Sequence, residues 1–129
     1  MTAVPEKAAQ ATMVDLATLL GWSVYHTFDS RSSASGFPDL VLARERLVFA
    51  EVKKVGQKPR PDQVEWLDAL VLADCETYLW TIDDMQEIAE VLQSSHRLSG
   101  CHSSWERARV RLGAGGVAGH VGTRRRRAA

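Results

Sequence analysis

The sequence predicts a single α/β domain, with elements in the order α-β-β-β-α-β-α over the first 93 of its 129 residues. A chain of this length can bury a core without disulfides or a structural metal. Hydrophobic residues make up 45% and charged residues 25%, as in a soluble globular protein. Two cysteines fit a reducing compartment, and the start of the chain lacks the pattern of a signal peptide. No apolar run approaches the roughly 20 residues that cross a bilayer, so we expect a cytoplasmic protein with no membrane segment.

Apolar periodicity places each element. Met13, Ala17 and Leu20 form a helical stripe that Gly21 ends. Short runs apolar on both faces predict central strands of a covered sheet. Asp83 or Asp84 is expected to cap the last helix. In chain order the sequence predicts a helix over 5–20, strands over 22–28, 39–43 and 47–53, a helix over 62–73, a strand over 77–80 and a final helix that ends near residue 93.

Charge divides the chain into two parts. Residues 1–93 hold 8 basic and 15 acidic residues, a net charge of −7, whereas residues 94–129 hold 8 and 1, a net charge of +7. Periodicity also fails after Gln93, where Gly, Arg, Ser and Ala dominate up to Arg124–Arg127. We therefore predict a domain over 1–93 and a basic, mostly disordered tail over 94–129. An acidic body with a basic arm is typical of chains that meet polyanions, although such arms can also be inert.

Two polar residues fall on faces predicted to be buried. Glu6 lies in the middle of the stripe of the first helix, with Gln10 beside it. Gln63 is in line with Leu67 and Leu70 in the second helix. A buried carboxylate is unfavourable unless it is paired or binds a cation. The alternative is that both residues lie in exposed first turns and meet water.

Asp39, Glu51 and Lys53 extend this pattern to the sheet. Alternation puts Glu51 and Lys53 on one face of an otherwise apolar strand, and a short hairpin brings Asp39 close to Glu51. The alternatives are a plain Glu–Lys ion pair and an Asp that only forms a turn after Pro38. One cause would explain all five positions, namely convergence on a single pocket. Clustered carboxylates resist ionising together unless a cation joins them, and oxygen ligands favour Mg²⁺ or Mn²⁺.

These residues resemble a known family. The segments Gly36-Phe-Pro-Asp39, Phe49-Ala-Glu-Val-Lys53 and Gln63-Val-Glu-Trp66 follow a helix that bears Glu6 and Gln10. This series is similar to the VRR-NUC branch of the PD-(D/E)XK nucleases over residues 5–92. The Arg- and Gly-rich tail has no counterpart in the family pattern.

The resemblance implies a restriction-endonuclease-like core with a mixed four-stranded sheet flanked by helices. It implies Mg²⁺ or Mn²⁺ held by Asp39, Glu51 and the backbone carbonyl of Val52, with Lys53 as the catalytic lysine. Glu6 matches an accessory acid that also reaches the metal, and Gln63 matches an accessory glutamine. Stand-alone phage-type members are similar to structure-selective DNA nucleases and often act as dimers, which implies a homodimer.

Basic residues near the predicted pocket are candidate contacts to nucleic-acid phosphates, with a solvated loop as the alternative reading. They are Lys54, Lys58, Arg60 and Arg31. Two rival functions stay open, a nucleic-acid-binding or interaction module that does not cut and an ordinary α/β interaction protein. A site-specific restriction enzyme is disfavoured because so small a body leaves little room for a base-reading element.

Overall fold

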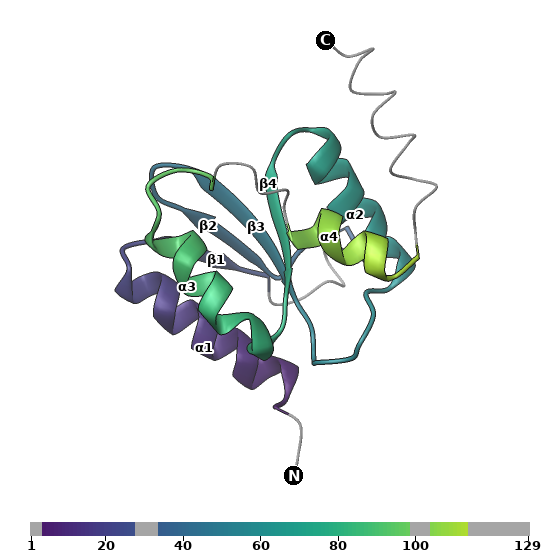
Figure 1. Ribbon diagram of the computed structural model, residues 1–129, viewed down its shortest axis with the longest axis horizontal. Helices are drawn as coiled ribbons and strands as arrows, with labels where there is room; N and C mark the ends of the chain where they lie inside the picture. Colours follow the sequence, from purple (N-terminus) through teal and green to yellow (C-terminus); the bar gives the residue numbers. More distant parts are fainter. Residues whose placement is uncertain (1–3, 28–33, 99–103, 114–129) are drawn as a thin grey trace.

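The computed structural model describes residues 4–27, 34–98 and 104–113 of the chain (Figure 1). It confirms the predicted α/β class and the order of its elements. In chain order these are α1 (Glu6–Leu19), β1 (Ser23–His26), β2 (Leu40–Ala43), β3 (Leu47–Val52), α2 (Pro61–Leu72), β4 (Glu76–Trp80), the 3-10 helix η1 (Ile82–Asp84), α3 (Met85–Gln93) and α4 (Ser104–Arg111).

The four strands form one mixed sheet in the order β1-β2-β3-β4. β1 and β2 pair antiparallel, as do β2 and β3, whereas β3 and β4 run parallel. The crossover between the two parallel strands is α2. This sheet, with helices on its faces, is consistent with the predicted restriction-endonuclease-like core. β2 and β3, whose sequences are apolar on both faces, occupy the two inner positions of the sheet, as predicted.

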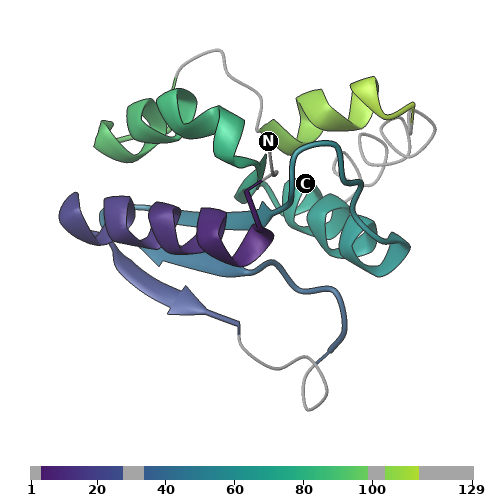
Figure 2. The same ribbon diagram turned by 90° about the horizontal axis from the view of Figure 1, so that it is seen from below.

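Helices cover the two faces of the sheet unequally. α1 and α3 pack side by side on one face and enclose the main core, which includes Met13, Leu40, Trp80 and Leu92 (Figures 1 and 2). On the opposite face α2 and α4 lie together over β4, where they pack against Leu79. The opposite face of β1, β2 and β3 therefore keeps partly exposed side chains. No described helix is long and apolar enough to span a membrane.

The prediction of an unstructured tail from residue 94 is wrong for residues 104–111, which form α4. Trp105 is 1% exposed and packs with Ala108 against Leu67 of α2. The indole N–H of Trp105 donates to Asp68 Oδ1 at 2.9 Å, and Arg109 Nε donates to the same oxygen at 2.6 Å. One tryptophan and one arginine thus hold a segment whose remaining residues are mostly polar. The other predicted tail residues, 99–103 and 114–129, lie outside the described residues.

The start of the last core helix also differs from its prediction. Thr81 caps the 3-10 turn η1 by accepting a hydrogen bond from the N–H of Asp83 at 3.2 Å. Asp84 accepts from the backbone N–H of Thr81 at 2.8 Å, and its side chain does not cap α3. Thr81 and Asp84 thus form a capping box at η1, one turn before α3.

Candidate active site

The loop before β2 docks against the start of α2, and Gly36 makes that approach possible. Gly36 has φ +91°, and a Cβ atom there would lie 2.5 Å from the carbonyl oxygen of Asp62 and 2.9 Å from the backbone nitrogen of Gln63. No side chain fits between these backbones. The Gly36-Phe-Pro-Asp39 segment is consequently fixed to the helix turn that carries Gln63.

Asp39 sits where the β2–β3 ladder ends. The last paired residues are Leu40 and Ala50. Beyond them, the backbone N–H of Val52 donates to Asp39 Oδ2 at 3.0 Å. The side chain therefore replaces the strand carbonyl that this N–H would otherwise meet. The backbone carbonyl of Asp39 accepts from the N–H of Thr27 on the other side, at 2.9 Å. Both contacts hold the carboxylate beside β3.

Glu51 lies on the α2 side of β3 and is 1% exposed. Gln63 Nε2 donates to Glu51 Oε2 at 2.7 Å, and Lys53 Nζ lies 3.7 Å from the same oxygen. The Gln63 amide is oriented because its Oε1 accepts from the backbone N–H of Arg60 at 2.8 Å. Lys53 is itself 4% exposed. The predicted inward position of Gln63 and the shared face of Glu51 and Lys53 are both confirmed.

The second oxygen of Glu51 has no donor. The pKa of Glu51 is raised to about 9, and burial is the largest cause. The carboxylate of Asp39 adds to the rise through its charge and a side-chain hydrogen bond, Lys53 opposes it, and Glu6 adds a small increase. Glu51 Oε1 is one of two buried side-chain polar atoms without a hydrogen-bond partner in the described part of the chain. A carboxylate oxygen buried beside a second carboxylate needs a proton or a cation.

A pocket of about 170 Å³ opens next to these groups. Its lining includes Glu6 from the first turn of α1, Asp39 and Gln63, so the structure brings three predicted residues to one cavity. Glu51 and Lys53 lie behind this wall rather than in it. Among the described residues no group of three or more Asp, Glu, His or Cys side chains is placed to hold a metal. Glu6 shares the pocket without completing such a group.

The residues predicted to contact phosphates divide into three cases. Arg60 lines the pocket, and its guanidinium pairs with Asp62 at 3.3 Å. Lys54 and Lys58 are exposed on the loop between β3 and α2. Arg31 lies outside the described residues. The structure thus brings one of the four to the pocket wall.

Two further contacts near the pocket were not predicted as parts of the site. His26 Nε2 and Gln10 Oε1 are 2.5 Å apart, which joins β1 to the helix turn that follows Glu6. Phe37 lines the pocket and packs edge-on against Trp66 of α2, with ring centroids 5.0 Å apart. In the sequence, Phe37 is marked only by its position inside the Gly36-Phe-Pro-Asp39 segment.

Comparison with known proteins finds no match among protein-family models, curated proteins or solved structures. The class of protein must therefore be argued from the geometry of the site and from the residues that resemble the VRR-NUC branch.

Proposed function

We propose that this protein is a metal-dependent endonuclease of the VRR-NUC type, which hydrolyses phosphodiester bonds in branched, flap or junction DNA. The observation that carries the proposal is Glu51, a buried carboxylate with one oxygen unpartnered and with Asp39 beside it. Such an arrangement disfavours the empty ionised state and favours a bound cation. An ordinary structural ion pair would satisfy both oxygens.

The ligand set proposed for Mg²⁺ or Mn²⁺ is Asp39, Glu51 and the backbone carbonyl of Val52. The set is chemically suitable, because Mg²⁺ takes oxygen ligands and is usually held by one or two protein carboxylates. When bound, the metal lowers the pKa of a water and offsets charge on the phosphate in the transition state. Glu6 lines the same pocket and is assigned an accessory role there.

The remaining side chains of the proposed site hold Glu51 in place and balance negative charge on the phosphate. Gln63 donates to Glu51 Oε2 through its amide, so that Oε1 is the oxygen left for a metal ligand. Lys53 is placed to stabilise negative charge that develops on the phosphate, or to orient the attacking water. Its ammonium is buried beside Glu51, where low solvent access strengthens electrostatic effects. Arg60 on the pocket wall is assigned to a backbone phosphate of the substrate.

The rival function is a module that binds nucleic acid or a protein partner without cutting. The site residues argue against it, since a module that does not cut has no need for a buried carboxylate with one oxygen unpartnered. An ordinary α/β interaction protein predicts neither affinity for metal nor stabilisation by Mg²⁺.

Cleavage of labelled branched and linear DNA tests the proposal. Wild-type protein is incubated with Mg²⁺ or Mn²⁺ beside Glu51→Gln and Lys53→Met, which keep the size of each side chain. We expect metal-dependent cutting that falls on the order of 10³-fold in both variants. Glu87→Gln, on an exposed ion pair of α3, should cut like the wild type. Binding of DNA without cutting in either metal would favour the rival module.

A further inference from the structure

Within the described residues, no helix covers β1, β2 and β3 on one face of the sheet, and we call this the open face. Its members share the side of the sheet that α2 and α4 cover at β4. All are partly or fully exposed, with Tyr25 at 63% and Leu47 at 48%. From β1 to β3 they are Ser23 and Tyr25, Val41 and Ala43, and Leu47 and Phe49.

The open face leads directly to the candidate active site. Tyr25 pairs with Val41 and Val41 with Phe49, so these three side chains form one row across the sheet. Asp39 lies two residues before Val41, and Glu51 lies two residues after Phe49, so both are at the same end of these antiparallel strands. Alternation along the strands puts both on the side of the row. Two residues of a strand span about 7 Å. A ligand that covers the row is therefore adjacent to any phosphate held at the site.

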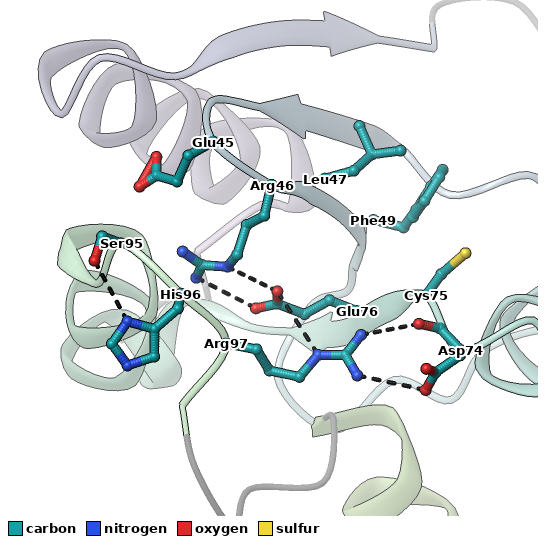
Figure 3. A pocket seen from close by; sticks show the side chains of 10 residues that line it. All are labelled: Glu45, Arg46, Leu47, Phe49, Asp74, Cys75, Glu76, Ser95, His96 and Arg97. Atoms are coloured by element: carbon teal, nitrogen blue, oxygen red, sulfur yellow. Dashed lines mark hydrogen bonds and ion pairs between the residues drawn. The ribbon is translucent and has the colours of Figure 1, made fainter.

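Aromatic contacts join this row to the pocket of the site. Phe37, which lines that pocket, packs edge-on against Phe49 with ring centroids 6.1 Å apart. Phe49 also lines a second hollow of about 470 Å³ at the other end of β3. Figure 3 shows Leu47 and Phe49 side by side on one flank of this hollow and Arg97 across from them. A hollow of this size accommodates a group as large as a nucleobase.

The chemistry of the open face selects its occupant. Its six side chains carry no charge, so the face does not attract the phosphates of an intact duplex. Aromatic rings do provide planar surfaces on which unpaired bases stack. A second copy of the chain is disfavoured, because six residues fall far short of the roughly 20–30 per side of a standard interface.

We propose that the open face is a stacking platform for unpaired bases of the substrate strand, with Tyr25 and Phe49 as its aromatic contacts. The proposal deepens the nuclease function and rests on it. It assigns as substrate a DNA with a single-stranded segment beside the scissile bond, rather than a fully paired duplex. Bases stack on the sheet, while the backbone of the same strand reaches the pocket that Asp39 and Gln63 line.

Binding of DNA that carries 2-aminopurine in a single-stranded overhang tests the platform. All proteins carry Glu51→Gln, so no strand is cut during the measurement. Tyr25→Ala is the first variant, and Phe49→Leu is the second because it keeps an apolar contact for Phe37. Loss of one stacked base should weaken overhang binding about 5- to 100-fold and abolish part of the fluorescence quenching. Val110→Ala, an equally exposed apolar position on α4, serves as the control.

The outcomes separate the possible occupants. Weaker overhang binding with unchanged binding of blunt duplex supports the platform. Equal losses for both DNAs, or no loss for either, overturn it. A wild-type dimer in sedimentation that Tyr25→Ala converts to monomer, with quenching unaffected, assigns the face to a second copy. If wild-type protein cuts no DNA but the overhang effect persists, the nuclease proposal fails and the platform survives.

Discussion

Two buried glutamates on neighbouring strands differ in how completely their carboxylates are partnered. Glu51 on β3 and Glu76 on β4 are 1% and 3% exposed. Glu76 is saturated with donors, because Arg46 Nε donates to it at 2.8 Å and the hydroxyl of Tyr78 at 2.6 Å. Arg97 Nε lies 3.9 Å away (Figure 3). Glu51 accepts one hydrogen bond, from the amide of Gln63, and the ammonium of Lys53 lies 3.7 Å from the same oxygen. The other oxygen of Glu51 has no partner.

The surroundings of Glu76 explain why it is structural. Arg46 also donates to the carbonyls of Val91 and Ser94 at 2.7 and 2.6 Å, and it stacks on the ring of Trp22. The charge of Glu76 is therefore balanced by Arg46, whose three guanidinium nitrogens all donate hydrogen bonds. Burial and the neighbouring carboxylate raise the pKa of Tyr78, which keeps its hydroxyl a donor. Burial alone therefore does not point to a function, whereas a buried carboxylate oxygen without a partner requires an explanation.

The largest effect that separates the two glutamates is on stability. Glu76→Gln should lower the free energy of unfolding by about 3–5 kcal/mol, because it leaves the guanidinium of Arg46 buried without its counter-charge. Glu51→Gln should leave the free energy of unfolding unchanged or raise it, since a neutral amide suits this position. Urea unfolding of both variants measures the difference. Equal destabilisation by the two substitutions would contradict the distinction between them.

The pH dependence of the free energy of unfolding should also reveal the unusual environment of Glu51. The pKa of Glu51 is raised from 4.5 to about 9 in the folded state, so between these values the unfolded chain has released a proton that the native state keeps. The free energy of unfolding of metal-free protein should therefore fall as pH rises through this range, by up to about 1.4 kcal/mol per pH unit.

Glu51→Gln has no such proton and supplies the control. Its stability advantage over the wild type should grow from pH 5 to pH 9 and then level off. Thermal unfolding of both proteins in metal-free buffers measures this trend. A constant difference across the range would mean that Glu51 stays ionised in the folded protein.

A smaller effect is expected at Gly36, which positions the site without taking part in it. Gly36→Ala forces a Cβ atom against the backbone of Asp62 at a φ of +91°. We expect a loss of at least about 1 kcal/mol in the free energy of unfolding. Cleavage should fall together with stability, because the start of α2 carries Gln63. Gly56→Ala has a similar φ of +86° with open space around it, so it isolates the backbone strain from the clash.

The sequence predicts most of the fold because its apolar patterns are clean. The two inner strands and α2 are read from periodicity to within one or two residues. Asp39, Glu51 and Lys53 stand out because each interrupts such a pattern. Lys53 and Glu51 indeed form the ion pair that was the alternative reading, at 3.7 Å, but this pair leaves one oxygen of Glu51 without a partner.

What the sequence hides are contacts that join distant segments. Glu76 lies one residue before the predicted strand, and its cation Arg46 is 30 residues away, so no local pattern connects them. α4 is similarly hidden, because its buried apolar residues Trp105 and Ala108 include only one large side chain and lie among charged residues. The docking of Gly36 on α2 depends on a backbone approach that a one-dimensional pattern does not record. These features are tertiary, and they decide how the site is held.

Titration of Mn²⁺ into the metal-free protein by isothermal calorimetry shows whether Asp39 and Glu51 bind a metal. We expect one strong site in the wild type and in Glu76→Gln, lost in Glu51→Gln and in Asp39→Asn. Binding at pH 7 should also release a proton, because Glu51 must ionise to coordinate the metal. Mn²⁺ binding that is unaffected by Glu51→Gln, or no binding to folded wild-type protein, would mean that these carboxylates do not form a metal site.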